Sequence, residues 1–140
     1  DWWGGKFIIK GILEPEDAVK ALDVGADAII VSNHGGRQLD QTSSTISMLP
    51  KIVEAVKGKS AIWLDGGIRS GQDILKAVAL GADNTLIGRA MSYGLAANGI
   101  SGCEKALNIL HTELDMTMAL CGHKNLKEVD DSILNIENDF

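Results

Sequence analysis

The sequence lacks several features that would point to particular classes of protein. It has only two cysteines in 140 residues, Cys103 and Cys121, too few for a disulfide framework and not spaced like a metal or redox motif. We therefore expect both thiols to be reduced, in or near the core, in a cytosolic compartment. No signal peptide is visible, and no apolar run reaches the roughly 18 residues of a membrane span. An excess of positive charge is also missing. The net charge of −6 argues against non-specific nucleic-acid binding.

What is present is the composition of an ordinary globular protein, with 45% hydrophobic and 23% charged residues. The length suits one domain with a core of its own. The first residue is Asp1 rather than Met, so we expect the chain to be part of a longer protein.

Apolar, β-branched segments that look like buried strands begin near residues 7, 28, 61 and 85. The fourth of these strands is expected at residues 85–87. Each is followed by a helical pattern, which makes four strand-then-helix units. Such alternation predicts an α/β fold with parallel strands and right-handed crossovers.

The helices carry recognisable start and stop signals. Residues 14–17, Glu-Pro-Glu-Asp, place proline and acids in a first helical turn, and residues 42–44 offer hydroxyl caps for a second helix. Pro50 falls inside that second pattern, where we expect a break or a new helix start. Further helices are expected from near Ala90 and over residues 101–120.

Each predicted strand ends in a polar group. In α/β folds the carboxyl ends of the strands share one edge, and ligands bind there. The four groups are Lys10, residues 32–37, residues 65–69 and residues 88–89.

The second group contains a base and an anion clamp. His34 can exchange a proton near neutral pH, and Arg37 can grip a carboxylate through two parallel hydrogen bonds. Gly35 and Gly36 between them allow a sharp turn. This pattern indicates chemistry on a small acid.

The third and fourth groups can be interpreted as a phosphate cradle. Glycines expose backbone N–H groups, the helix that starts near Ser70 offers its positive end, and Arg69 and Arg89 supply charge. Asp65 suits a sugar-like hydroxyl better than a phosphate. Together they suggest a phosphorylated polyol. The alternative is that Gly66-Gly67 and Gly88-Arg89 are only turns.

Residues 32–40, Ser-Asn-His-Gly-Gly-Arg-Gln-Leu-Asp, resemble the signature of the FMN-dependent α-hydroxy-acid dehydrogenase and oxidase family, which includes L-lactate dehydrogenase and glycolate oxidase. Agreement extends to residues 9–11, 65–69 and 87–89. The resemblance implies the C-terminal half, strands five to eight, of a (β/α)8 TIM barrel, followed by a long C-terminal helix. Residues 1–140 would be a single partial domain.

The resemblance also implies roles for the polar groups. His34 would be the catalytic base, Arg37 would bind the substrate carboxylate, and Lys10 would lie beside the pyrimidine edge of FMN with Ser32 against the flavin. The proton would come from the substrate's α-carbon or from its hydroxyl, and the sequence leaves both routes open. No metal is expected. The ribityl chain and phosphate would be held by Asp65, Gly66, Gly67, Arg69, Gly88 and Arg89.

The expected function is oxidation of a small, lactate-like L-2-hydroxy acid, with oxygen, a quinone or a cytochrome as final acceptor. The family's first four β/α units are absent from the chain, so we expect activity only in the full barrel, and none from the 140-residue chain alone. The chain would pair with the missing half or form a homo-oligomer. We expect a cytoplasmic location, with any peripheral membrane contact made through the missing half.

Two other interpretations stay open. The chain could be an inactive half-barrel that self-associates and retains only a phosphate-binding site. It could also belong to a different phosphate-binding barrel enzyme, such as a flavin oxidoreductase that acts on heterocycles. The presence of both His34 and Arg37 argues against this second interpretation.

Overall fold

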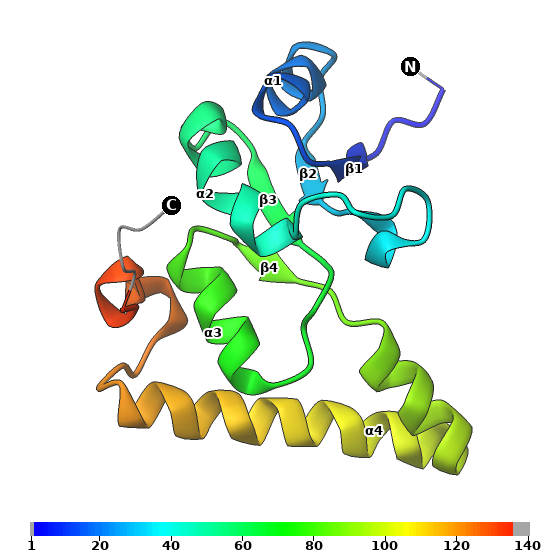
Figure 1. The fold of residues 1–140 in the computed structure, drawn as a ribbon, viewed down its shortest axis with the longest axis vertical. Coiled ribbons are helices and arrows are strands. Elements are labelled where there is room, and N and C mark those ends of the chain that lie inside the picture. Colours follow the sequence, from blue (N-terminus) through cyan, green and yellow to red (C-terminus); the bar gives the residue numbers. More distant parts are fainter. Residues whose placement is uncertain (1, 136–140) are drawn as a thin grey trace. The chain divides into compact units, whose positions relative to one another are not determined.

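The computed structural model describes residues 2–135 and contains one four-stranded parallel sheet (Figure 1). The strands are β1 (Ile8–Ile12), β2 (Ala28–Val31), β3 (Ala61–Leu64) and β4 (Asn84–Thr85), in the order β1-β2-β3-β4. The α/β class and the parallel pairing are therefore confirmed. The bounds expected for the fourth strand, 85–87, were wrong. That strand ends at Thr85, although Leu86 N still donates to Leu64 O at 2.9 Å.

The described part of the chain has four α-helices, which lie between or after the strands: α1 (Pro15–Asp23), α2 (Thr45–Val56), α3 (Gly71–Ala79) and α4 (Arg89–Leu120). It also has short 3-10 turns at η1 (His34–Gly36), η2 (Leu126–Glu128) and η3 (Asp131–Ile133). Inside α4 the backbone leaves helical geometry at Asn98 and Gly99. The expected helix from near Ala90 and the expected long C-terminal helix are thus both present, on either side of this break.

The chain divides into two compact units. Residues 1–67 and 81–86 hold all four strands with α1 and α2, and we call them the sheet unit. Residues 68–80 and 87–140 hold α3 and α4, and we call them the helical unit. The single partial domain expected from the sequence stays a prediction.

The core of the sheet unit forms around β2, whose four residues Ala28–Val31 are all buried. This strand pairs on both sides, and α1 and α2 pack against each other and on the sheet (Figure 1). A run of β-branched residues suits such a strand because both of its faces exclude water. The helices contribute the buried side chains of Ala18, Ala21, Leu49, Ile52 and Val56.

Two aspartates bind the backbone at the amino ends of the strands. Asp27 Oδ2 accepts from Phe7 N at 2.8 Å, and Asp83 Oδ2 accepts from Ile62 N at 2.7 Å. Each aspartate also donates its own N–H, to Phe7 O and to Ile62 O, both at 2.8 Å. Lys6 Nζ adds an ion pair with Asp27 at 2.6 Å. The carboxylates therefore tie neighbouring segments of the sheet together.

In the helical unit α3 packs on α4 through close backbone contact. A methyl group at Gly71 would clash with the backbone at Leu114, and one at Gly94 would lie 2.5 Å from Gly102 O. The second contact lets the two segments of α4 fold back on each other across the break at Gly99. Glycine is required at both places for lack of space.

Two further expectations were wrong. Pro50 does not interrupt α2, which runs unbroken from Thr45 to Val56. Proline there removes one N–H, but Pro50 is exposed, so its ring does not disturb the buried face that contains Leu49 and Ile52. Cys121 is exposed rather than near the core, because it caps the end of α4, whereas Cys103 is partly buried; both are free thiols.

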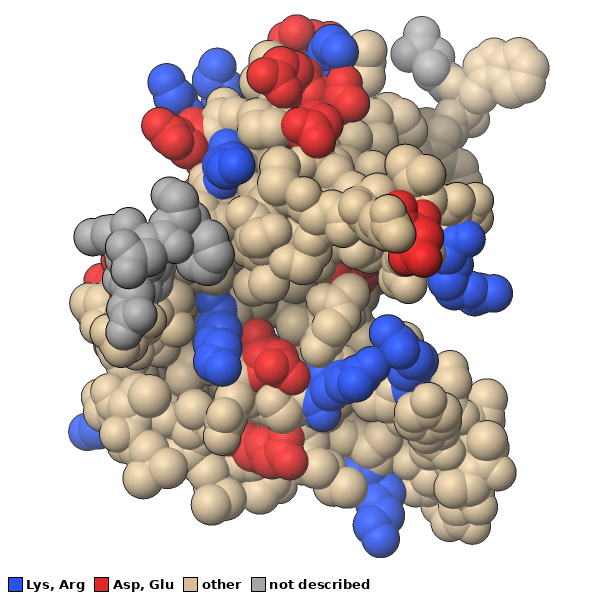
Figure 2. Space-filling view, in the orientation of Figure 1, with Lys and Arg blue, Asp and Glu red and all other residues tan. Residues whose placement is uncertain are grey.

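The acidic and basic side chains on the face drawn in Figure 2 lie in several small groups, and most of that face is uncharged. Within residues 2–135 no helix is long and apolar enough to cross a membrane. No group of three or more His, Cys, Asp or Glu side chains in this range could hold a metal ion.

Candidate active site

Three polar side chains meet at the carboxyl ends of β1, β2 and β3. Lys10 of β1 is in register with Ile30 of β2, which is in register with Trp63 of β3. Two residues further along come Ser32 and Asp65, and side chains two apart share one face of a sheet. Lys10 Nζ donates to Ser32 Oγ at 2.8 Å and pairs with Asp65 Oδ2 at 2.6 Å. Three residues that the sequence singled out separately thus form one bonded cluster.

The cluster leaves one acceptor without a donor. Asp65 Oδ1 is buried and has no hydrogen-bond partner within the described part of the chain. The Asp65 side chain is 17% exposed and the Lys10 side chain 38%, so a ligand can reach both. A buried carboxylate oxygen without a donor is costly, and a ligand hydroxyl would relieve that cost.

The turn that follows β2 is fixed mainly through its backbone. His34, Gly35 and Gly36 have φ angles of 55°, 67° and 71°, so three consecutive residues are left-handed. Glycine adopts this geometry freely, whereas His34 does so at a cost. His34 N donates to Ser32 Oγ at 3.1 Å, and Gly35 N donates to Asn33 Oδ1 at 3.0 Å. Ser32 therefore joins the turn to the cluster.

The side chains of His34 and Arg37 are both exposed. Within residues 2–135 neither side chain makes a hydrogen bond or an ion pair. The base and the anion clamp expected from the sequence are therefore free to meet a ligand.

Thr45 supports the turn that follows β3, a role that no sequence pattern predicted. Thr45 is only 3% exposed, and its hydroxyl donates to Asp65 O at 2.6 Å. Gly66 has a φ of 91°, and a methyl group on it would lie 3.1 Å from Thr45 Oγ1. Thr45 stands next to the residues that looked like helix caps, so only the fold distinguishes it from them.

The remaining candidates lie in the helical unit. Arg69 and Arg89 are exposed, and Gly88 precedes the first turn of α4. The N–H groups at the start of α3 are bonded within the chain. Those of Arg69 and Ser70 donate to Asp73 Oδ2 at 3.0 and 2.9 Å. Gly71 N donates to Glu113 Oε2 at 2.9 Å. The phosphate cradle stays a prediction.

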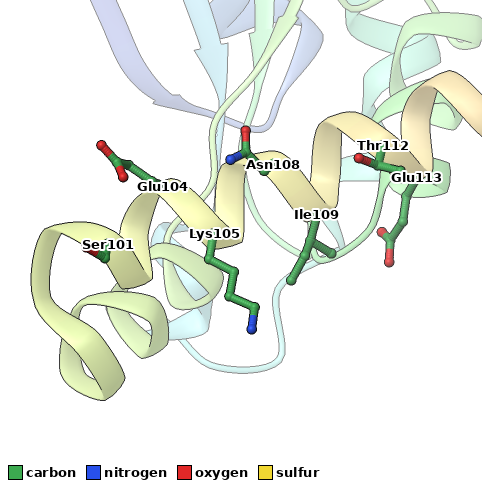
Figure 3. A pocket seen from close by; sticks show the side chains of 7 residues that line it. All are labelled: Ser101, Glu104, Lys105, Asn108, Ile109, Thr112 and Glu113. Atoms are coloured by element: carbon green, nitrogen blue, oxygen red, sulfur yellow. The ribbon is translucent and has the colours of Figure 1, made fainter.

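A shallow depression of about 440 Å³ runs along α4 and contains none of the candidate site residues. Figure 3 shows Lys105 and Ile109 pointing to the opposite side of the helix from Glu104 and Asn108. Such a surface feature does not enclose a ligand. Its lining consists of Ser101, Glu104, Lys105, Asn108, Ile109, Thr112 and Glu113.

The chain belongs to the FMN-dependent dehydrogenase family, whose sequence profile matches residues 1–136. The L-lactate dehydrogenase of Pectobacterium atrosepticum is 49% identical to it over 137 residues, which are 97% of this chain and 36% of that protein. The chain therefore spans about a third of the length of this curated relative.

Solved structures of mandelate oxidase share the fold. The structure with benzoyl-formic acid has a TM-score of 0.86 and 48% identity, over 89% of this chain and 37% of that one. A variant of mandelate oxidase with a monooxide FMN adduct has the same TM-score and identity, and 40% of it is covered. The four parallel strands and the long C-terminal helix thus match part of a TIM-barrel flavoenzyme.

The residues of the sheet unit fit the FMN that this family uses. The ribityl chain of FMN carries hydroxyl donors, and Asp65 Oδ1 is a buried acceptor without one. Lys10 adds a cation beside it. The donor and acceptor types therefore agree with the cofactor.

Proposed function

We propose that the protein oxidises a small, lactate-like L-2-hydroxy acid to the 2-oxo acid, with FMN as the electron acceptor, in the context of a complete barrel. The observation that carries this proposal is the bonding at Ser32 Oγ, which accepts from Lys10 Nζ and from His34 N. The candidate base, His34, and the candidate cofactor contact, Lys10, are therefore both hydrogen-bonded to the same side-chain oxygen. Membership of the family supports the same reaction class.

Several of these residues would hold FMN. Bound FMN would supply a two-electron acceptor. Lys10 and Ser32 would contact its ring system, and Asp65, with Gly66 and Gly67 beside it, would accept from the ribityl hydroxyls. The phosphate would be held by Arg69, Gly88 and Arg89.

His34 and Arg37 would act on the substrate. Arg37 would hold the carboxylate through two hydrogen bonds, which fixes the orientation of the α-carbon. The imidazole of His34 would take a proton from that carbon or from the hydroxyl. General-base catalysis of this kind contributes about 10²- to 10⁴-fold to a rate. The final acceptor would be oxygen, a quinone or a cytochrome.

The exposed edge of the sheet supports association as part of the proposal. Among the described residues, 2–135, β1 pairs only with β2, and Phe7 and Ile8 are 48% and 38% exposed. An open edge with apolar residues favours pairing with a further strand. We propose that further β/α units of the family cover it, and that the 140-residue chain alone does not oxidise lactate. Self-association of an inactive chain is the second candidate, for the same reason.

The test uses the full-length protein and a panel of 2-hydroxy acids. Reduction of FMN is followed as bleaching of its absorbance without oxygen, and then with oxygen. We expect His34→Gln to lower kcat by about 10³-fold because the general base is lost, while FMN stays bound. His111→Gln is the matched control, since His111 is an exposed histidine on α4. A His34→Gln variant with unchanged turnover per bound FMN would contradict the role of His34.

A further inference from the structure

Gly11 occupies a bulge in β1. Lys10 is in register with Ile30 and Ile12 with Val31, so Gly11 between them has no partner in the ladder. Its φ is 98°, a conformation that residues with a side chain rarely adopt. Bulges often re-aim side chains near functional sites. Gly11 is therefore in a position to affect the residues around it.

The space left by the missing side chain of Gly11 faces the imidazole of His34. A methyl group on Gly11 would lie 3.0 Å from His34 Cε1, 3.7 Å from Nδ1 and 4.0 Å from Nε2. Carbon atoms in ordinary contact are about 3.5–4.0 Å apart, so the ring would have to retreat by about half an ångström. The imidazole thus lies against the backbone of the bulge.

Ser32 fixes both partners of this contact. It accepts from Lys10 Nζ at 2.8 Å and donates its N–H to Ile12 O at 3.1 Å, so it is bonded to the residues on each side of Gly11. Ser32 Oγ also accepts from His34 N at 3.1 Å. The backbones of Ile12 and His34 are thus both tied to one buried residue, which limits how far the loop that carries His34 can shift.

We propose that Gly11 is a positioning residue for His34: the bulge omits a side chain so that the imidazole lies against the backbone of β1 at a fixed place. The inference rests on the proposed role of His34 as the base. A base that is displaced by up to about 1 Å transfers a proton poorly, because the donor and acceptor atoms are no longer aligned.

The first test compares two glycine substitutions in the full-length protein. Gly25 has a φ of 90° and no atom within 4 Å of a methyl group built on it, so Gly25→Ala reproduces the backbone strain without the ring contact. We expect Gly11→Ala to lower kcat by about 10- to 100-fold, with KM and the FMN absorbance spectrum at wild-type values. Gly25→Ala should lower the melting temperature and leave kcat unchanged. Equal kcat values for the two variants would overturn the inference.

A second measurement tests the contact between Gly11 and His34 directly. In wild-type protein labelled at glycine and histidine, the Gly11 α-protons should give a nuclear Overhauser effect to the His34 Cε1 proton, assigned by its loss in His34→Gln. Absence of this signal overturns the contact. If the signal is present and His34→Gln turns over normally, it is the proposed function that fails. The two failures are therefore distinguishable.

Discussion

At the amino ends of the strands, Asp27 and Asp83 each accept a backbone N–H from a neighbouring segment, whereas Asp65 at the carboxyl ends accepts none. Asp65 Oδ2 pairs with Lys10 instead, and its buried Oδ1 has no partner among residues 2–135. All three residues follow or precede strands of the same sheet. They differ in whether the protein itself completes their hydrogen bonds.

Asp27 and Asp83 stabilise the fold through their carboxylates, whereas the carboxylate of Asp65 is left with an acceptor that a ligand could use. A carboxylate that accepts backbone N–H groups contributes to the stability of the fold. A buried oxygen without a donor costs stability until a ligand brings one. The unpaired oxygen at the carboxyl edge thus costs the fold some stability, as we expect if that edge binds a ligand.

The largest effect should come from Asp65→Asn. We expect the dissociation constant of FMN to rise by about 10- to 100-fold, because the amide replaces an acceptor by a donor and ends the ion pair with Lys10. Titration of FMN fluorescence measures it. In free-energy terms, the stability of the protein without FMN should change much less than its affinity for FMN. Unchanged FMN affinity would remove Asp65 from the binding site.

Asp83→Asn makes the same change at the amino ends of the strands. It weakens the bond to Ile62 N, and we expect the free energy of unfolding to fall by about 1–2 kcal/mol in urea titrations. The dissociation constant of FMN should stay at its wild-type value. Should this variant lose as much FMN affinity as Asp65→Asn, the two edges would not differ in the way described.

Thr45→Val tests the carboxyl edge from within, since Thr45 supports the turn that carries Asp65 and Gly66. Its buried hydroxyl donates to Asp65 O, and loss of that bond should cost about 1 kcal/mol of stability. Because the turn at Gly66 loosens as well, FMN affinity should also fall. Ser47→Ala, at an exposed position of the same helix, is the control and should change neither quantity by as much.

The smallest effect concerns the pH dependence at Asp27. The hydrogen bond from Lys6 and then that from Phe7 N hold the pKa of Asp27 below its ordinary value. A group with a lowered pKa stabilises the folded state above its unfolded pKa, and this contribution is lost as the pH falls through the folded pKa. The stability difference between wild type and Asp27→Asn should therefore be constant near neutral pH and shrink below about pH 4. Urea titrations at several pH values measure it, with the exposed Glu54→Gln as control.

Much of the fold was predictable because its signals are local. The bounds of β2 and β3 follow from short apolar runs that stop at polar residues, and the Ser70 cap of α3 follows from hydroxyl chemistry. The break expected at Pro50 was wrong because the helix loses only one hydrogen bond there, while a whole face of it packs on the sheet. The stabilisation from that packing outweighs the lost bond, and a local sequence pattern does not show it.

The candidate site was predictable only as separate residues. Lys10, Ser32, His34 and Asp65 were named from their places at strand ends, but their bonds depend on the register between strands. The bulge at Gly11 was invisible because Lys10-Gly11 looks like the end of a strand, whereas the pairing continues to Ile12. Side-chain contacts across strands require the fold.

The shared oxygen of Ser32 has a consequence for how this site could change during evolution. Lys10 Nζ and the backbone N–H of His34 both donate to that one atom, so a substitution of Ser32 that removes its hydroxyl breaks both bonds at once. A substitution of Lys10 breaks only one of them. Substitutions at Ser32 and Lys10 should therefore be non-additive, as is usual for residues that share a contact, and Ser32 should tolerate change less well than Lys10 during evolution.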